Sequence, residues 1–218
     1  MKLYIAAALA LFASPVVAQE DCICLKCLFG QHHMVQAVST SMSPALKAGD
    51  CRTSRYINGE FAQLEYGDVI YFQHPINDQQ YLDRLIGKGG DTVQLIDGVV
   101  WLNGEALPQQ RIADYEVIFE PSGPNGSLPR CQNRPKRGEI CRAERFVETA
   151  PNGRSYEVLN LKNGRMDNTE PFVIPEGFVF VLGDNRDNAI DSRFPQSGVL
   201  HGVGFVPVEN IIGIIEEG

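Results

Sequence analysis

The 218-residue sequence has no uninterrupted apolar run that reaches the about 20 residues a bilayer-spanning helix requires. It also lacks a clear helical repeat of about ten residues or more, which argues against a helical bundle. Basic residues are the minority, with 19 Lys and Arg against 27 Asp and Glu, for a formal net charge of -8. That balance argues against nucleic acid as a partner, because a polyanionic backbone would be repelled.

What the chain does contain is a series of short β-prone runs separated by turn residues. The runs lie at residues 35–38, 67–72, 81–86, 92–96, 99–102, 178–182 and 210–215. Asn58-Gly59, Asp97-Gly98 and Asn103-Gly104 are turn dipeptides, and the first is a strong hairpin signal. The sequence therefore predicts a mainly β protein with one full core and room for a small appended domain.

Residues 1–18 have the pattern of a cleaved secretory signal peptide. Lys2 supplies a positive start, Leu3 to Phe12 an apolar core, and Val16-Val17-Ala18 a small-residue cleavage site. An uncleaved membrane anchor is the alternative. Either reading predicts an exported protein, periplasmic or otherwise extracytoplasmic and peripheral to the membrane.

All six cysteines follow this segment, and an even count in an oxidising compartment predicts disulfides. Cys131 and Cys141 flank a polar loop and are expected to pair. The other two bridges would tie a cysteine-rich lead, residues 19–36, to the chain near residue 51, through Cys22, Cys24, Cys27 and Cys51. Their connectivity is open. A metal site using the Cys-x-Cys-x-x-Cys motif with His32 or His33 is the alternative.

Residues 105–169 differ in composition, with frequent Gly, Pro, Asn and Arg, and predict a small inserted β subdomain stapled by Cys131 and Cys141. Residues 130–145 carry a local excess of four positive charges. A solvated loop explains this excess, and contact with anionic lipid or an acidic partner is the alternative.

Two polar runs stand out as a candidate site. Residues 39–43 hold four hydroxyls around Met42, and a dense set of ionisable groups follows the apolar run 178–182. Such groups are rarely buried unless paired, so we expect a hydrogen-bonded scaffold. Its expected members are Asp184, Arg186, Asp187, Asp191 and Arg193.

Three runs together resemble the conserved boxes of the type I signal peptidases, in the family's order. They are Ser39-Thr40-Ser41-Met42-Ser43-Pro44-Ala45-Leu46, the stretch from Asp83-Arg84 to Gly90-Asp91, and Gly183-Asp184-Asn185-Arg186-Asp187-Asn188-Ala189-Ile190-Asp191-Ser192-Arg193. The resemblance covers about residues 37 to 216. It implies an antiparallel β-sheet catalytic domain, formed by residues 37–104 and 170–218.

The resemblance also implies roles. Ser41 would be the nucleophile, and Ser39 would bind the oxyanion together with the Ser41 N–H. Arg84 and Ser192 would belong to the scaffold of the site. No cofactor or metal is implied. The substrates would be preproteins or exported peptides with small residues at the first and third positions before the cut, met at the outer face of the cytoplasmic membrane.

The family's base, a lysine, is replaced by Asp83, and the serine that bonds to that lysine is replaced by Ala189. Ala45 and Gly89 also depart from the family pattern and need not affect catalysis. Asp83 could serve as base if burial raises its pKa, and Lys88, His74 and His201 are weaker candidates. Two functions follow from this: an endopeptidase with an altered base, or a catalytically inactive homologue that binds peptides or a membrane-protein partner.

Overall fold

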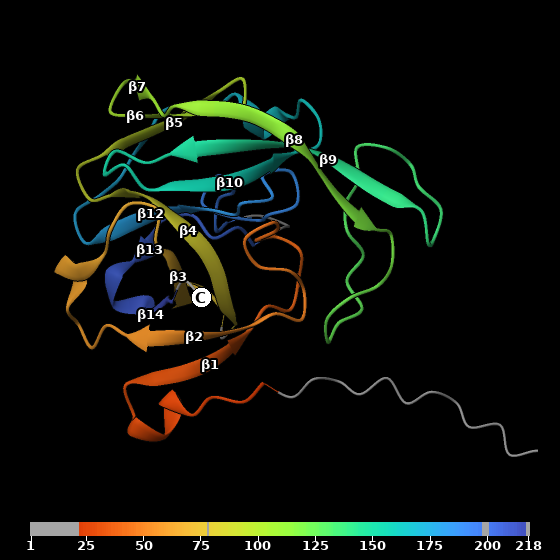
Figure 1. Cartoon of the computed structure of the whole chain (residues 1–218). Coiled ribbons are helices and arrows are strands. Elements are labelled where there is room, and N and C mark those ends of the chain that lie inside the picture. The colour runs from red at the N-terminus through yellow and green to blue at the C-terminus, as the bar shows by residue number, and fades with distance from the viewer. Residues whose placement is uncertain (1–21, 78, 198–200, 217–218) are drawn as a thin grey trace, which may run out of the picture.

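The computed structural model describes residues 22–77, 79–197 and 201–216, and it confirms a mainly β chain (Figure 1). The predicted signal segment, residues 1–18, lies outside the described residues. Every pairing between named strands is antiparallel. The described residues include no helix with the length and apolar character needed to cross a membrane.

The strands of the described residues form three sheets. The largest has the order β1-β2-β14-β3-β4-β12-β13, comprising β1 (His32–Gln36), β2 (Cys51–Tyr56), β3 (Val69–Gln73), β4 (Gln80–Lys88), β12 (Phe178–Leu182), β13 (Val206–Pro207) and β14 (Ile211–Ile215). The second comprises β11 (Phe172–Val173), β5 (Thr92–Ile96), β6 (Val99–Leu102) and β7 (Glu105–Ala106). The third comprises β10 (Ser155–Asn160), β9 (Ile140–Thr149) and β8 (Gln109–Ile118). The 3-10 turns are η1 (Lys26–Phe29), η2 (Phe61–Gln63), η3 (Arg165–Asp167) and η4 (Val208–Asn210).

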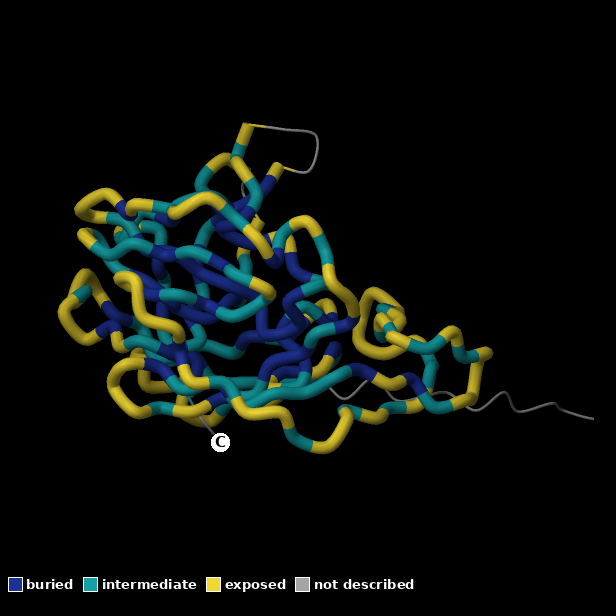
Figure 2. The backbone as a smooth tube through the Cα atoms, turned by 90° about the horizontal axis from the view of Figure 1, so that it is seen from above, coloured by how far each residue is buried: buried dark blue, intermediate teal, exposed yellow. Residues whose placement is uncertain are grey.

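Strand β12 is the centre of the core because both of its faces are buried. Phe180 and Leu182 pack in one apolar cluster, whereas Val179 and Val181 pack in a second. This alternation explains why the strand reads as a continuous apolar run rather than an apolar–polar one. Figure 2 shows the buried backbone gathered in the main body. The charged loop that follows β12 therefore starts from a rigid base.

Two of the three predicted turns join paired strands, whereas the hairpin expected at Asn58-Gly59 is wrong. The turns at Asp97-Gly98 and Asn103-Gly104 join β5 to β6 and β6 to β7, with positive φ at all four residues. Asn58-Gly59 also has positive φ values, 45° and 81°, but the chain continues into η2. Strand β14 lies between β2 and β3, so no hairpin forms there. The local turn signal was correct, but a distant strand supplied the partner.

The described part of the cysteine-rich lead contains regular structure, η1 and β1. Strand β1 begins at His32, inside the lead, and ends at Gln36, before the predicted 35–38 run is complete. His33 stacks on Tyr56 and lies 4.8 Å from the Tyr71 ring centroid. These aromatic contacts favour an extended segment packed on β2 and β3.

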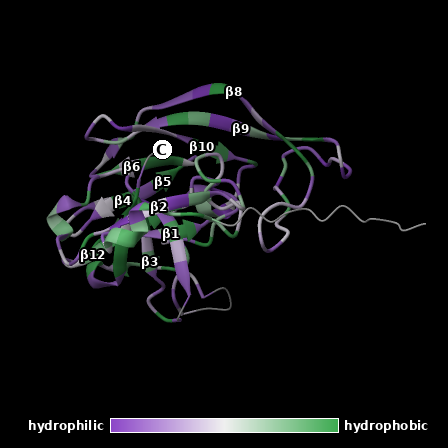
Figure 3. Cartoon of the chain, turned by 60° about the horizontal axis from the view of Figure 1, so that its bottom comes forward, coloured by the Kyte–Doolittle hydropathy of each residue, from purple (hydrophilic) through white to green (hydrophobic). Residues whose placement is uncertain are grey.

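The disulfides include the predicted pair Cys131–Cys141. Cys22–Cys51 ties the lead to β2, and Cys24–Cys27 closes a four-residue ring. The three-stranded sheet lies within residues 105–169, and the loop between β8 and β9 projects from the body (Figure 1). Polar and apolar segments alternate along β8 and β9 (Figure 3).

The basic excess at residues 130–145 is partly offset by acids outside that window. Arg137 pairs with Glu120, and Arg142 pairs with Glu116. The side chains of both pairs are exposed, which is what a solvated surface loop predicts.

Candidate active site

The serine run forms a tight turn after β1, anchored by its methionine. Met42 is buried with Ala37 and Leu46 in a small apolar cluster. Ser39 and Ser41 stay accessible, and their Oγ atoms lie 3.1 Å apart. The Ser41 N–H also donates to Ser39 Oγ, at 3.4 Å. The two predicted serines therefore lie side by side, and the Ser39 hydroxyl and the Ser41 N–H are neighbouring hydrogen-bond donors.

Two asparagines of the charged loop fasten this turn, and sequence reasoning missed both. The Asn185 N–H donates to the Ser41 carbonyl at 2.9 Å, and the Asn185 side chain donates to the Thr40 carbonyl at 3.1 Å. The Asn188 side chain donates to Thr40 Oγ1 at 2.7 Å. Because Thr40 is buried, these bonds satisfy polar groups that water does not reach. Both asparagines stand in the third run, which could have indicated their role, but the interpretation of that run considered only its charged residues.

Gly183 marks the point where Ser41, Asp83 and Ala189 meet. A Cβ built on Gly183 would lie 2.3 Å from Ala189 Cβ, 3.0 Å from the Ser41 carbonyl oxygen and 3.5 Å from Asp83 Oδ1. Only glycine leaves room for this convergence. Ser39, Ser41 and Asp83 also line one cavity of about 650 Å³. The two replaced positions, 83 and 189, thus lie at one place beside the serine turn.

Asp83 is a buried carboxyl without a counter-charge of its own. It is 3% exposed, and its Oδ2 has no hydrogen-bond partner among the described residues. Burial raises the pKa of Asp83 well above its usual range, Asp191 and Asp184 raise it further, and Arg193 opposes them. In the described part of the chain no hydrogen bond joins Asp83 to Ser41. Because its pKa is raised, Asp83 keeps its proton to a higher pH than an ordinary aspartate does.

Two buried ion pairs surround Asp83. Arg84 holds Asp184 through two parallel hydrogen bonds, at 2.7 and 2.6 Å. Arg193 holds Asp191 in the same way, with both bonds at 2.8 Å. Both pairs are almost fully buried, and bidentate geometry is the form in which such pairs are strongest. Arg84–Asp184 fixes the charged loop to β4, whereas Arg193–Asp191 joins two residues within the loop.

A third buried pair joins the loop to the three-stranded sheet. Arg186 bonds to both carboxylate oxygens of Glu148 on β9, and the Tyr156 hydroxyl on β10 also donates to Glu148. Glu148 is 0% exposed. Sequence reasoning missed it because it lies 38 residues from Arg186, in a run with no recognisable motif.

The remaining expected scaffold residues bond to the backbone. Asp187 accepts the Leu161 N–H at 2.8 Å, and Ser192 Oγ accepts the Val181 N–H at 2.9 Å. Ser192 is buried, whereas Asp187 is half-buried. Every expected scaffold residue is therefore engaged by a neighbour in or beside the loop.

The other candidate bases lie elsewhere. Lys88 donates to the Leu64 carbonyl and sits over the Tyr66 ring. Neither Lys88, His74 nor His201 is among the described residues that line the cavity of Ser41. Asp83 is the titratable candidate that this cavity contains.

Comparison with known proteins connects this arrangement to a family. The model of the family "Signal peptidase, peptidase S26" matches residues 7–217. The chain belongs to the S26 signal peptidase family. Signal peptidase I of Rickettsia typhi is 37% identical over 158 residues, which cover 68% of this chain and 49% of that protein. Signal peptidase I of Rickettsia felis is 37% identical over 157 residues, covering 68% and 48%.

A solved structure, a signal peptidase I from Enterococcus faecalis V583, is also similar. It is 22% identical, with a TM-score of 0.36, and the match covers 71% of this chain and 97% of that one. This S26 chain spans about half the length of the curated relatives it matches. Its three family-like runs, far apart in sequence, meet at Gly183.

Proposed function

We propose that this S26 family member is an exported serine endopeptidase that removes signal peptides, or processes a specialised exported substrate, after small residues. Ser41 is the nucleophile and Asp83 the base in place of lysine. The observation that carries the proposal is the shared cavity of Ser39, Ser41 and Asp83, with Asp83 Oδ1 and the Ser41 carbonyl both near Gly183. A serine hydroxyl requires such a base, because it is otherwise a poor nucleophile.

In the proposed reaction, the ionised Asp83 takes the Ser41 Oγ proton while Oγ attacks the scissile carbonyl carbon. The Ser39 hydroxyl and the Ser41 N–H turn to the oxyanion, where each donor typically lowers the barrier by about 3 kcal/mol. Asp83 then returns the proton to the leaving amine, and water releases the acyl group by the same base. The hydrogen bond between Asp83 and Ser41 would form in the complex with substrate.

The charged loop is proposed as the scaffold of this site. Arg84, Asp184, Arg186, Asp191 and Arg193 are buried and paired, which supports a positioning role rather than contact with substrate. Asp187 and Ser192 would act through their backbone bonds. The inserted segment, residues 105–169, would contribute through Glu148. Buried, paired side chains of this kind would hold the catalytic groups in the accurate geometry that catalysis requires.

Half-exposed apolar side chains support a substrate with small apolar residues before the cut. Val38 is 48% exposed, Ile190 is 42% exposed, and both line the cavity of Ser41. A substrate presented at the outer face of the cytoplasmic membrane would enter this cavity as an extended segment. We place the protein at the periphery of that membrane.

A catalytically inactive homologue that binds peptides is the second candidate. Two observations favour it: Ser41 Oγ has Ser39 as its partner, and Asp83 has no bond to Ser41 in the described chain. The same cavity would then hold peptides or a membrane-protein partner without cutting them.

Cleavage of a lipid-presented preprotein, measured across about pH 4 to 9, tests the proposal. Parent activity that disappears in Ser41→Ala and Asp83→Asn, but survives in the exposed-serine control Ser122→Ala, is the expected result. An inactive parent that gains activity in Asp83→Lys/Ala189→Ser would instead establish the second candidate.

A further inference from the structure

The Cys24–Cys27 disulfide ties η1 to the chain just before it, and neither cysteine lines the cavity of Ser41. Nothing in the proposed proteolysis uses this bridge. The ring contains only Leu25 and Lys26 between its cysteines, a sequence separation of 3. The other two bridges span 29 and 10 residues. A ring this short removes little chain entropy from the unfolded state, so the fold depends on it least.

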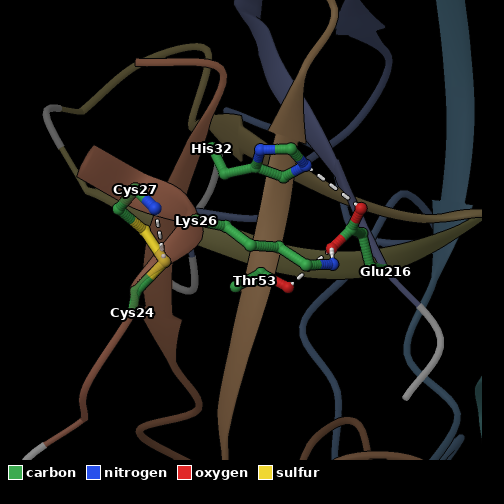
Figure 4. Close-up of a disulfide and its surroundings, with 6 residues drawn as sticks. All are labelled: Cys24, Lys26, Cys27, His32, Thr53 and Glu216. Atoms are coloured by element: carbon green, nitrogen blue, oxygen red, sulfur yellow. Dashed lines mark hydrogen bonds and ion pairs between the residues drawn. A yellow bond between two sulfur atoms is a disulfide. The ribbon is translucent and has the colours of Figure 1, made fainter. Parts of the chain in front are cut away.

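The segment that carries this disulfide is held by other contacts (Figure 4). Lys26 Nζ lies 2.8 Å from Glu216 Oε2, which also accepts the Thr53 hydroxyl at 2.8 Å. His32 Nε2 lies 3.1 Å from the other oxygen of Glu216. The Cys22–Cys51 bridge fastens the chain just before the ring. Opening Cys24–Cys27 would therefore leave η1 attached to β1, β2 and the end of β14.

One sulfur of the pair already has a donor that suits a thiolate. The Cys27 N–H donates to Cys24 Sγ at 3.0 Å. When the S–S bond opens, this N–H would stabilise negative charge on Cys24. Stabilising the reduced form makes a disulfide a stronger oxidant, which favours exchange with incoming thiols.

The surface around the pair is apolar and exposed. Ile23, Leu25, Leu28 and Phe29 are 74–83% exposed, and both cysteines are half-buried. These four side chains are the most exposed large apolar residues in the described chain. A reactive disulfide within an apolar surface suits a polypeptide partner whose own cysteines have apolar neighbours.

We propose that Cys24–Cys27 is a redox-active disulfide that exchanges with cysteine pairs of exported polypeptides. A partner thiolate bonds to one sulfur of the pair, the Cys24–Cys27 bond breaks, and the other sulfur leaves as a thiolate. A second partner thiol, after losing its proton, displaces the mixed disulfide. The partner is oxidised by two electrons to a disulfide, and the pair is reduced to two thiols. A low-molecular-weight disulfide of the compartment reoxidises it.

Equilibration of the purified chain with glutathione redox buffers, followed by alkylation and mass spectrometry of each cysteine pair, tests this. Cys24–Cys27 is expected to open first, with an equilibrium constant for reduction at least about tenfold above that of Cys131–Cys141, or about 30 mV for two electrons. Tryptophan fluorescence of Trp101 reports whether the fold survives. Equal resistance of these two bridges would overturn the proposal.

Partner exchange is measured with a reduced synthetic peptide whose two cysteines are flanked by leucines. Oxidation of the peptide is expected to be lost in Cys24→Ser/Cys27→Ser and kept in Cys131→Ser/Cys141→Ser and in Ser41→Ala. Leu28→Ser/Phe29→Ser is expected to slow exchange with the peptide but not with glutathione. Peptide oxidation that is unchanged in Cys24→Ser/Cys27→Ser would refute the assignment, whatever the proteolytic activity.

Discussion

Replacing Glu148 with Gln is expected to destabilise the fold far more than the same change at Glu157. Glu148 is 0% exposed and neutralises Arg186 through two hydrogen bonds, the shorter at 2.5 Å. Burial opposes the charge of Arg186, but Glu148 outweighs it and holds the pKa of Arg186 above its usual value. Glutamine leaves that buried guanidinium without a counter-charge, which typically costs about 3–5 kcal/mol.

Glu157 is the matched control because its side chain is 40% exposed and pairs with Arg145 on the neighbouring strand. Removing this charge should cost about 0–1 kcal/mol, since water screens the pair. Urea unfolding with the disulfides intact measures the free energy of unfolding of each variant. In thermal unfolding, Glu148→Gln should lower the melting temperature by about 6–20 °C. Equal losses for the two variants would refute the reasoning. Arg186→Met/Glu148→Leu, which removes both charges, should recover much of the stability.

Two further substitutions test the centre of the site. Asp83→Asn removes a carboxyl whose folded pKa lies above its unfolded one, so ionisation costs the parent stability as pH rises from about 4 towards the folded pKa. Urea unfolding at several pH values should give the variant no higher free energy of unfolding than the parent at about pH 4 and below. Its advantage over the parent should grow as the pH rises above that value. A difference that stays constant with pH would contradict this. Gly183→Ala places a methyl group 2.3 Å from Ala189 Cβ and should lose about 1–3 kcal/mol in the same assay. Gly164→Ala, where the nearest atom would be 3.4 Å away, should lose distinctly less, and equal losses would count against the packing argument.

Local signals predicted those parts of the fold that local chemistry determines. Asp97-Gly98 and Asn103-Gly104 made hairpins because each turn joins two consecutive strands that pair directly with each other. Asn58-Gly59 carries the same signal, but its outcome depended on β14, which pairs with both flanking strands from the far end of the chain. Long-range pairing is decided by burial of whole faces, which a dipeptide does not encode.

In the candidate site, too, sequence motifs predicted some residues, whereas others depend on long-range contacts. The order of the three runs predicts one site for Ser41 and Asp83, and the two residues line the same cavity. Glu148 could not be found, because a lone glutamate in a strand of the insertion has no local feature that distinguishes it from a solvated one. Its role follows from the buried guanidinium it faces.

The buried charges around the site balance without residue 83. Three arginines pair with three carboxylates, in Arg84–Asp184, Arg193–Asp191 and Arg186–Glu148. Asp83 adds a fourth carboxyl with no partner in the described chain, so the cluster is neutral only while Asp83 is protonated. The scaffold therefore does not need a charge of either sign at this position. For this reason Asp83→Lys/Ala189→Ser is expected to fold with a neutral lysine, and a double variant that unfolds where Asp83→Asn does not would show that the scaffold depends on an acid there.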